Sequence, residues 1–249
     1  MVSDMENKSL LNQKTVEITD QITLHIPTVG EILNDQATYF SLVSIMTSTP
    51  LQYMVQLDDM HIDYTKISDF DMFRLFFPVY ARQDISILFG DLALDDIYAG
   101  HDNSTNLEVL YSPKSGVKID EYVYWKMAKL MRQIHLIKYN RAMPKGEHTK
   151  KYLLDKERRH LKNLERMRKK KEFEQSDFEK LVIALVNHQS FKYDYDSVNQ
   201  LSIYNFYQSF QQIQHEINFN NVMRGIYAGT IDTSKLTDKS VLSWIKPDK

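Results

Sequence analysis

Two kinds of hydrophobic periodicity organise the chain, and each indicates a different secondary structure. From Thr15 to Ile26, apolar residues alternate with polar ones on either side of Asp20-Gln21, which predicts a β-hairpin with one buried face. After Pro27, apolar residues recur at spacings of three and four, as is typical of amphipathic helices. We therefore expect a small amount of antiparallel sheet and a larger amount of helix.

Capping and breaking residues set the expected bounds of the first helices. Thr28-Val29-Gly30-Glu31 has the form of a capping box and predicts a helix to about Thr47. Further helices are expected to begin at Thr49-Pro50 and at Ser68, the second one stopped by Pro78. The expected core residues of these three helices are Ile32, Leu33, Phe40, Val43 and Ile45, then Leu51, Met54, Val55 and Leu57, then Phe70, Phe73, Leu75, Phe76 and Phe77.

Shorter apolar runs follow before residue 140. The pattern predicts strands over Ile85–Phe89, Leu107–Tyr111 and Val117–Ile119, the first of them ended by Gly90. Asp120 is expected to cap a helix that runs to about Tyr139. Residues 15–140 are thus predicted to form an α+β N-terminal domain.

The remaining sequence predicts helices only. A linker over Asn140–Gly146 precedes a stretch from Glu147 to Glu179 that contains no helix breaker. Ser202 is expected to cap a helix over Ile203–Ala228, with Gly229 in the left-handed position after its end. Its expected core residues are Ile203, Phe206, Phe210, Ile213, Ile217, Val222 and Ile226. A short last helix is expected over Lys235–Ile245, and it can dock through Leu242, Trp244 and Ile245.

The predicted fold class is α+β and predominantly helical, with three parts. They are the α+β domain at 15–140, a basic helical connector at 141–180 and a helical C-terminal domain at 181–249. Hydrophobic residues make up 43% of the chain, which is enough for a packed core and too many for a disordered protein. The chain has no Cys, which excludes disulfides, thiolate zinc sites and Cys nucleophiles. No signal-peptide core and no membrane span is apparent, so we expect a soluble, non-secreted protein that contacts no membrane.

Charge is distributed very unevenly. Between Lys145 and Lys171, twelve residues are Lys or Arg and four are Asp or Glu, which gives a net charge of +8. The whole chain carries −2, so the rest of it carries −10. Such a stretch can be an exposed connector that docks on an acidic protein surface, or a phosphate contact for nucleic acid. We favour the docking arm because aromatic residues, which specific nucleic-acid readers use for stacking, are few here. The candidate residues for either role are Lys150, Lys151, Arg158, Arg159, Lys162, Arg166, Arg168, Lys169 and Lys170.

Candidate chemistry is weak. The groups Asp58, Asp59, His61 and Asp63, and Asp91, Asp95 and Asp96, contain metal-ligating side chains, but solvated turn acids explain both groups better. No zinc-protease, nucleophile-elbow or phosphate-loop motif is present. We therefore predict no catalytic residues, no metal and no cofactor, and a non-enzymatic protein. A metal-dependent enzyme built on the acidic groups is the least favoured alternative.

The helix after Ser202 carries aromatic and amide residues on more than one face. A core needs a single stripe, and interfaces are rich in Tyr and Phe, so the other face is a candidate partner surface. Its proposed partner-binding residues are Tyr204, Tyr207, Phe210, Gln211 and Gln214. In the alternative interpretation, the basic helix covers this second face.

Four segments are similar to those of one group of viral proteins. They are His25–Leu33, Met46–Pro50, Ile87–Leu92 and Gly225–Asp232. In these segments the chain resembles tail-assembly chaperones and related tail-gene products of tailed bacteriophages. The resemblance implies a non-enzymatic morphogenesis protein and supplies no active-site residues.

The resemblance also implies the partners and the location. The expected partners are other phage tail or virion proteins, the tape-measure protein among them, with a homo-oligomer as an open alternative. The expected location is the host cytoplasm during phage assembly, and presence in the mature virion stays open. The alternative function is a phage nucleic-acid-binding protein that uses the basic helix.

Overall fold

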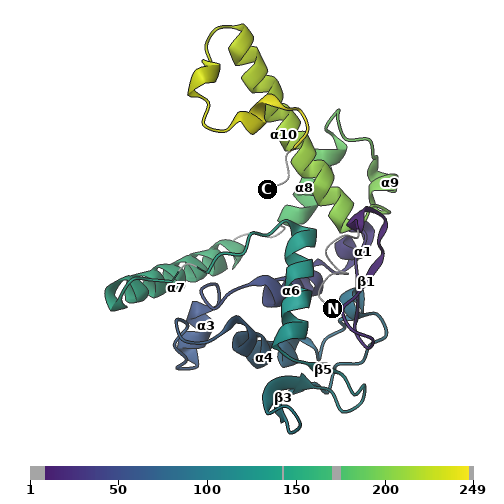
Figure 1. The fold of residues 1–249 in the computed structure, drawn as a ribbon, viewed down its shortest axis with the longest axis vertical. Helices are drawn as coiled ribbons and strands as arrows, with labels where there is room; N and C mark the ends of the chain where they lie inside the picture. Colours follow the sequence, from purple (N-terminus) through teal and green to yellow (C-terminus); the bar gives the residue numbers. More distant parts are fainter. Residues whose placement is uncertain (1–8, 142, 170–174, 247–249) are drawn as a thin grey trace. The chain divides into compact units, whose positions relative to one another are not determined.

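The computed structural model describes residues 9–141, 143–169 and 175–246, and for Arg168 it describes the backbone alone. Within these residues the chain is mainly helical and has two small antiparallel sheets, which confirms the predicted class (Figure 1). Two compact units are present. The N-terminal unit comprises Gln13–Pro27 and Glu31–Gln175, and the C-terminal unit comprises Met1–Asn12, Thr28–Gly30 and Ser176–Lys249. The three predicted domain ranges stay a prediction.

The N-terminal unit begins with the predicted hairpin. Strands β1 (Thr15–Glu17) and β2 (Thr23–His25) pair antiparallel, with Val16 opposite Leu24. The N–H of Ile18 donates to the carbonyl of Ile22 at 2.8 Å and closes the turn. Ile18, Ile22, Leu24 and Ile26 are buried, so the period-two pattern identified the core face correctly.

The single helix predicted from residue 29 to residue 47 is wrong, because the structure contains two helices there. Helix α1 (Val29–Asn34) is followed by α2 (Gln36–Thr47), and Asp35 lies between them with non-helical backbone angles. The Asp35 carboxylate accepts the N–H of Thr38 at 3.3 Å and so caps α2. Ile32, Val43 and Ile45 are buried as predicted, whereas Leu33 and Phe40 are only half-buried.

Two predicted helix boundaries next to Pro residues are wrong, namely the start of one helix and the end of another. Helix α3 (Met54–Asp59) begins after Pro50, because Gln52 accepts the N–H of Thr49 through its side chain and holds residues 49–53 in turns. Helix α4 (Asp69–Tyr80) has the predicted Ser68 cap but continues through Pro78. The N–H of Ala81 donates to Phe77 at 2.9 Å, so the Pro removes one hydrogen bond without ending the helix.

The strand predicted over Ile85–Phe89 is also wrong. Ser86–Phe89 form a single helical turn, α5, because Asp84 accepts the N–H of Ser86 at 3.0 Å and starts a turn. Gly90, predicted to end a strand, instead ends this helical turn, with φ of 59°. An apolar run this short does not distinguish a strand from a buried helical turn.

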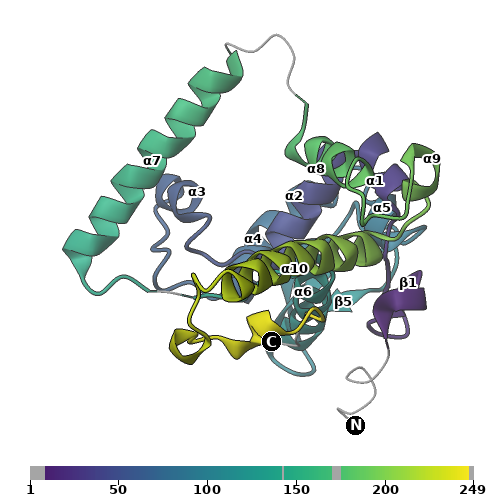
Figure 2. The same ribbon diagram turned by 90° about the horizontal axis from the view of Figure 1, so that it is seen from above.

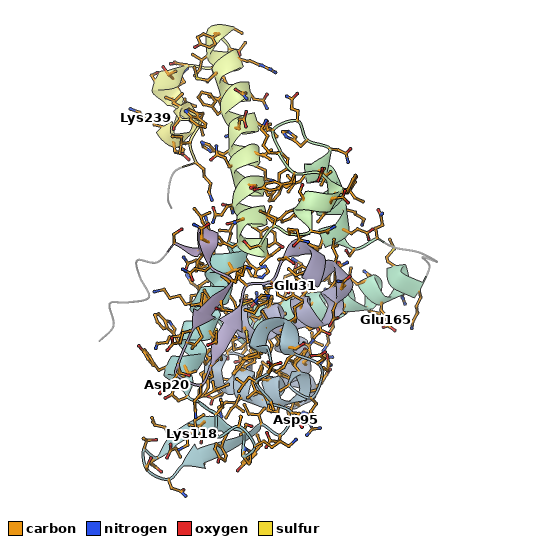
Figure 3. All side chains as sticks on the ribbon, turned by 90° about the vertical axis from the view of Figure 1, so that its right-hand side faces the viewer. Asp20, Glu31, Asp95, Lys118, Glu165 and Lys239 are labelled. Carbon is orange, nitrogen blue, oxygen red and sulfur yellow. The ribbon has the colours of Figure 1, made fainter. Side chains whose placement is uncertain are left out.

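The second sheet has the order β3-β4-β5, antiparallel throughout. Strands β4 (Leu107–Tyr111) and β5 (Lys118–Ile119) confirm two predictions, whereas β3 (Tyr98–Asp102) was not predicted. Gly100 and Asp102 hide the alternation of β3, because Gly and Asp are uncommon in strands. Ion pairs of Asp95 with Lys114 and of Asp102 with Lys118 brace the surrounding loops, where Figure 3 labels Asp95 and Lys118.

Helix α6 (Glu121–His135) packs against α2 and α4 at the centre of this unit. The predicted Asp120 cap is present, but the helix ends four residues early because Leu136 adopts left-handed angles, with φ of 57°. Tyr124 of α6 lies 4.7 Å from Phe73 between ring centroids, and Phe73 stacks on Phe77 at 4.6 Å. This aromatic cluster forms the middle of the core.

We expect the stability of the chain to fall between pH 6.5 and pH 4 because of His135. Its Nε2 lies 2.8 Å from the Tyr39 hydroxyl, and burial lowers the pKa of His135 to about 4. The unfolded imidazole, with a pKa near its ordinary value, takes up a proton at higher pH than the folded one. This contribution is therefore complete above pH 6.5 and is lost as the pH falls, by at most about 1.4 kcal/mol per unit. Urea unfolding measures the free energy of unfolding at pH 7.5 and at pH 5. The loss of this free energy between the two pH values should be smaller in His135→Gln than in the wild type. An equal loss in both proteins would contradict the prediction.

The C-terminal unit combines three helices with two segments from the start of the chain. Its elements are the short 3₁₀ turn Leu10–Asn12, α8 (Asp177–Val186), α9 (Tyr195–Val198), α10 (Ile203–Tyr227) and 3₁₀ turns over Thr233–Lys235 and Lys239–Leu242. Thr28 forms a β-bridge with Ser202, and the N–H groups of Val29 and Gly30 donate to Leu201 and Asn199 at 2.9 and 3.1 Å. The predicted Ser202 cap and the left-handed Gly229, with φ of 68°, are confirmed. Phe206 is fully buried between Phe178 and Phe191.

Several predicted core residues of the C-terminal unit are not buried. Among the described residues of α10, only Ile203, Phe206 and Ile213 are buried, whereas Ile217 is 44% exposed. Phe210, Val222 and Ile226 are half-buried. The last segment forms 3₁₀ turns in place of the predicted helix, and Trp244 and Ile245 are exposed. It is held by side chains of α10, since Gln212 Nε2 donates to Trp244 O and His215 Nε2 to Ser243 O, both at 2.7 Å.

Replacing Gly30 with Ala should destabilise the C-terminal unit by about 1–3 kcal/mol, the usual cost of overpacking. A Cβ at this position would lie 2.9 Å from the Asn199 carbonyl oxygen, which accepts the Gly30 N–H. Gly100→Ala is the matched control, because its Cβ would meet only the Tyr98 ring at 3.5 Å. Thermal unfolding of the two variants measures the difference; equal melting temperatures would show that the close approach at Gly30 relaxes without cost.

Candidate functional site

The basic helix α7 (Glu147–Lys169) belongs to the N-terminal unit and starts after Gly146, whose φ is 111°. Figure 2 shows it as a long, separate helix with α3 beside it. The helical period divides its residues between two faces. The inner face carries Lys150, Leu154, Arg158, Leu161 and Leu164, and the outer face carries Lys151, Asp155, Arg159, Lys162, Arg166 and Lys169.

The first half of the inner face docks on an acidic segment of the same unit. Arg158 Nη2 lies 2.6 Å from Asp58 Oδ2 and 2.5 Å from Asp59 Oδ1, at the end of α3. Lys150 Nζ lies 2.7 Å from Asp63 Oδ2. These carboxylates raise the pKa values of Arg158 and Lys150. We call Asp58, Asp59 and Asp63 the acidic anchor.

The Lys150 end of the anchor is the more enclosed one. The Tyr64 hydroxyl donates to the Lys150 carbonyl at 3.2 Å, and the Lys150 ammonium lies 6.0 Å from the centroid of the Tyr64 ring. The side chains of Lys150 and Asp63 are 21% and 27% exposed. The hydrogen bond from Lys150, assisted by bonds from Thr65, holds the pKa of Asp63 well below its usual range. Asp63 therefore stays ionised to a lower pH than an ordinary Asp, and it holds α7 as an anion.

The acidic anchor occupies the first group of candidate metal ligands. Asp58, Asp59 and Asp63 face cationic side chains of α7, and no group of three or more His, Cys, Asp or Glu in the described ranges is arranged to hold a metal ion. In the second group, Asp96 accepts the Ser112 hydroxyl at 2.6 Å and the Lys114 N–H at 2.9 Å, and the Ser112 bond lowers its pKa. These contacts give the two groups structural roles as partners of hydroxyl, amide and cationic groups.

Beyond Arg158 the helix is exposed on all sides. Leu161, Leu164 and Met167 are 37%, 42% and 57% exposed. Leu161 and Leu164 continue the inner face, so the apolar stripe that begins beside the anchor extends past it. We call Leu161, Leu164 and Met167 the leucine stripe. Glu165, labelled in Figure 3, pairs with Lys169 at 2.6 Å on the same part of the helix.

The structure divides the predicted basic residues into groups. Lys150 and Arg158 bind the acidic anchor, and Lys169 pairs with Glu165. Lys151, Arg159, Lys162 and Arg166 are exposed, with Arg159 Nε donating to the Asp155 carbonyl at 3.1 Å. The Arg168 side chain and all of Lys170 lie outside the described residues. The functional assignment of all nine stays a prediction.

The predicted partner residues of α10 lie largely within the C-terminal unit. Tyr204, Tyr207, Phe210 and Gln211 are half-buried, and Gln214 is exposed. Burial raises the pKa of Tyr207 to about 12. The exposed large apolar residues described in this unit lie elsewhere, at Leu11, Tyr193, Tyr195, Ile217, Tyr227, Leu242, Trp244 and Ile245. The predicted α10 surface thus stays a prediction, and its aromatic members are also packing residues.

Sequence reasoning missed the acidic anchor as a binding site for the basic helix. The sequence places the two sides of this contact in separate predictions, one as a candidate metal site and the other as a candidate docking arm. A signal was present in the spacing: Lys150 and Arg158 are eight residues apart, close to two helical turns, and therefore share a face. Nothing local in the sequence connects that face to residues 58–63, which are about a hundred positions away.

Comparison with known proteins gives one match. Among the described residues, no helix is long and apolar enough to cross a membrane. No curated protein and no solved structure matches the chain significantly. Residues 167–247 match the family model described as YomV second domain, a phage-derived domain family, so this C-terminal part of the chain is similar to a phage-derived domain.

Proposed function

We propose that this chain is a non-enzymatic phage assembly protein that binds another tail or virion protein through the distal half of α7. The leucine stripe carries the proposal. Leu161, Leu164 and Met167 are exposed on a helix that is already held in place at its first half. A helix that presents leucines at spacings of three to seven next to basic residues is suited to binding another protein.

The charge of α7 indicates the chemistry of the partner. The helix carries nine cationic and four acidic residues, and the acidic anchor neutralises only Lys150 and Arg158. Two copies of α7 side by side would place like charges together, which opposes pairing between copies of this helix. The proposed partner is therefore a phage protein with an acidic surface around an apolar groove or helix, and the tape-measure protein is the first to test.

Co-purification tests this function directly. The tagged chain should bring down a tail or virion protein from phage-infected cells at low salt, and the recovered protein should be acidic in the bound region. The complex should weaken as salt screens the exposed charges of α7. Recovery of no tail or virion protein, or equal recovery by a variant that lacks the leucine stripe, would reject the proposal.

Nucleic-acid binding is the second candidate, and one observation favours it. Arg159, Lys162 and Arg166 lie on the outer face at spacings of three and four, and no carboxylate pairs with them among the described residues. The same face could contact phosphates in succession. Nucleic-acid binding explains fewer features of α7 than protein binding does, because phosphate contacts do not require the exposed leucines.

The two candidates differ in the face that they use. If the chain binds DNA, Arg159→Glu, Lys162→Glu and Arg166→Glu together should abolish binding to labelled single- and double-stranded oligonucleotides at 50 mM salt. The wild-type affinity should then fall by about tenfold or more between 50 and 200 mM salt, with a slope near the number of phosphates contacted. Absence of binding at 50 mM salt would remove this candidate and leave protein binding.

A further inference from the structure

A groove in the N-terminal unit lies between α4 and the start of β3, and the basic helix does not line it. Its volume is about 340 Å³, at the lower end of the range of small-molecule pockets. Leu75 and Pro78 of α4 and Ile97 and Ala99 around β3 supply its apolar lining. Tyr98, which also lines the groove, is 50% exposed, so the apolar surface of the groove continues to the molecular surface.

The strand beside the groove has a free edge. In the order β3-β4-β5, β3 is an outer strand, and no other strand among the described residues pairs with its second edge. Backbone N–H and C=O groups on such an edge can accept another strand. An extended peptide that adds to an edge places alternate side chains toward the neighbouring surface.

Two arginines give the groove its polarity. Arg82 is exposed and has no ion-pair partner in the part of the chain that the structure describes. Arg74 is 15% exposed; it pairs with Glu108 and, at 3.4 Å, with Asp71, while its buried Nε has no acceptor among the described residues. Asp71 is already engaged, since it also accepts the Ser68 hydroxyl at 2.7 Å. The groove therefore offers cationic donors for an incoming acceptor.

We infer that the free edge of β3 and the α4–β3 groove bind an extended peptide segment of a partner protein, with an apolar side chain in the groove and an Asp or Glu at Arg82. The backbone of β3 supplies hydrogen bonds that do not depend on the partner's sequence. The groove and Arg82 supply the selectivity for an apolar residue next to an acidic one. This surface is separate from the leucine stripe, so the inference does not depend on the function proposed for α7.

A displayed library of random ten-residue peptides tests the inference on the full chain. Selected peptides should carry an apolar residue within one or two positions of Asp or Glu and lack Pro in that stretch. Arg82→Glu should weaken their binding by at least about tenfold, as expected for loss of a charged hydrogen-bonded pair. Lys14→Glu is the matched control, because it makes the same charge change at an exposed residue away from the groove and should leave binding unchanged.

Hydrogen exchange supplies a second readout on the same peptides. The amides of β3, Tyr98–Asp102, should exchange more slowly in the complex, and the amides of α7 should not change. The inference is overturned if no peptide is enriched, if the enriched peptides bind Arg82→Glu as tightly as the wild type, or if β3 gains no protection. Concentration-dependent dimerisation that Arg82→Glu removes would also overturn it, because a second copy of the chain would then occupy the groove.

Discussion

Replacing Leu161 and Leu164 together with Asp should weaken binding of the phage partner by about 100-fold or more, while the chain stays folded. Two central apolar anchors of an interface commonly contribute this much. Both side chains are exposed, at 37% and 42%, so the free energy of unfolding should change by less than about 0.5 kcal/mol. Calorimetric titration of the co-purified partner measures the affinity, and urea unfolding measures the stability.

The control for this double variant must introduce the same charge. Lys162→Gln with Arg166→Gln makes the same net change of two charge units on the outer face of the same part of α7, away from the leucine stripe. If the stripe is the binding surface, this control should lose much less affinity than the leucine variant. Equal losses would show that the partner responds to the net charge of α7 alone, and an unaffected leucine variant would exclude the stripe.

Local signals in the sequence predicted the parts of the fold that depend on a few neighbouring residues. The caps at Ser68, Asp120 and Ser202 are each present, because a short side-chain oxygen satisfies an N–H group two or three residues later. The β1–β2 hairpin follows from its alternating pattern, and Gly229 follows the end of α10 in the left-handed conformation as expected. These features need no information from distant parts of the chain.

The predicted bounds and types of secondary-structure elements are wrong where two local preferences compete. Asp35 could have been a polar residue within one helix, but its carboxylate caps a new one. Pro50 suits a first helical position, yet the Gln52 side chain stabilises turns there. The run at residues 85–89 suits both a strand and a helical turn, and Asp84 decides in favour of the turn.

The contacts of the candidate site could be predicted only in part, because they join segments that are far apart in the sequence. The composition predicts a basic arm that docks on an acidic protein surface. The partners Asp58, Asp59 and Asp63 could not be identified, because their contacts with α7 span about a hundred residues. Likewise, the periodicity of α10 predicted a continuous core face, but too few elements of its unit cover Ile217 and the residues that follow.

Reversing Arg158 should detach α7 from the acidic anchor. Arg158→Asp would place a carboxylate against Asp58 and Asp59, which now lie 2.6 and 2.5 Å from the guanidinium. Like charges replace opposite ones at the end of α3, and in the part of the chain that the structure describes Lys150–Asp63 remains as the one ion pair between α7 and residues 58–63. A partly exposed pair of single side chains contributes about 1 kcal/mol or less, so that pair alone should not hold the helix in one position.

Spin labels can measure this detachment because the chain contains no Cys. Gln56→Cys on α3 and Lys162→Cys on α7 are both exposed and make no contact with the anchor. The label-to-label distance distribution should be narrow in the otherwise wild-type chain and broad in Arg158→Asp. Adding Asp58→Arg and Asp59→Arg to Arg158→Asp restores opposite charges and should narrow the distribution again. A distribution that stays narrow in Arg158→Asp would mean that contacts of α7 other than the ion pairs of Arg158 position the helix.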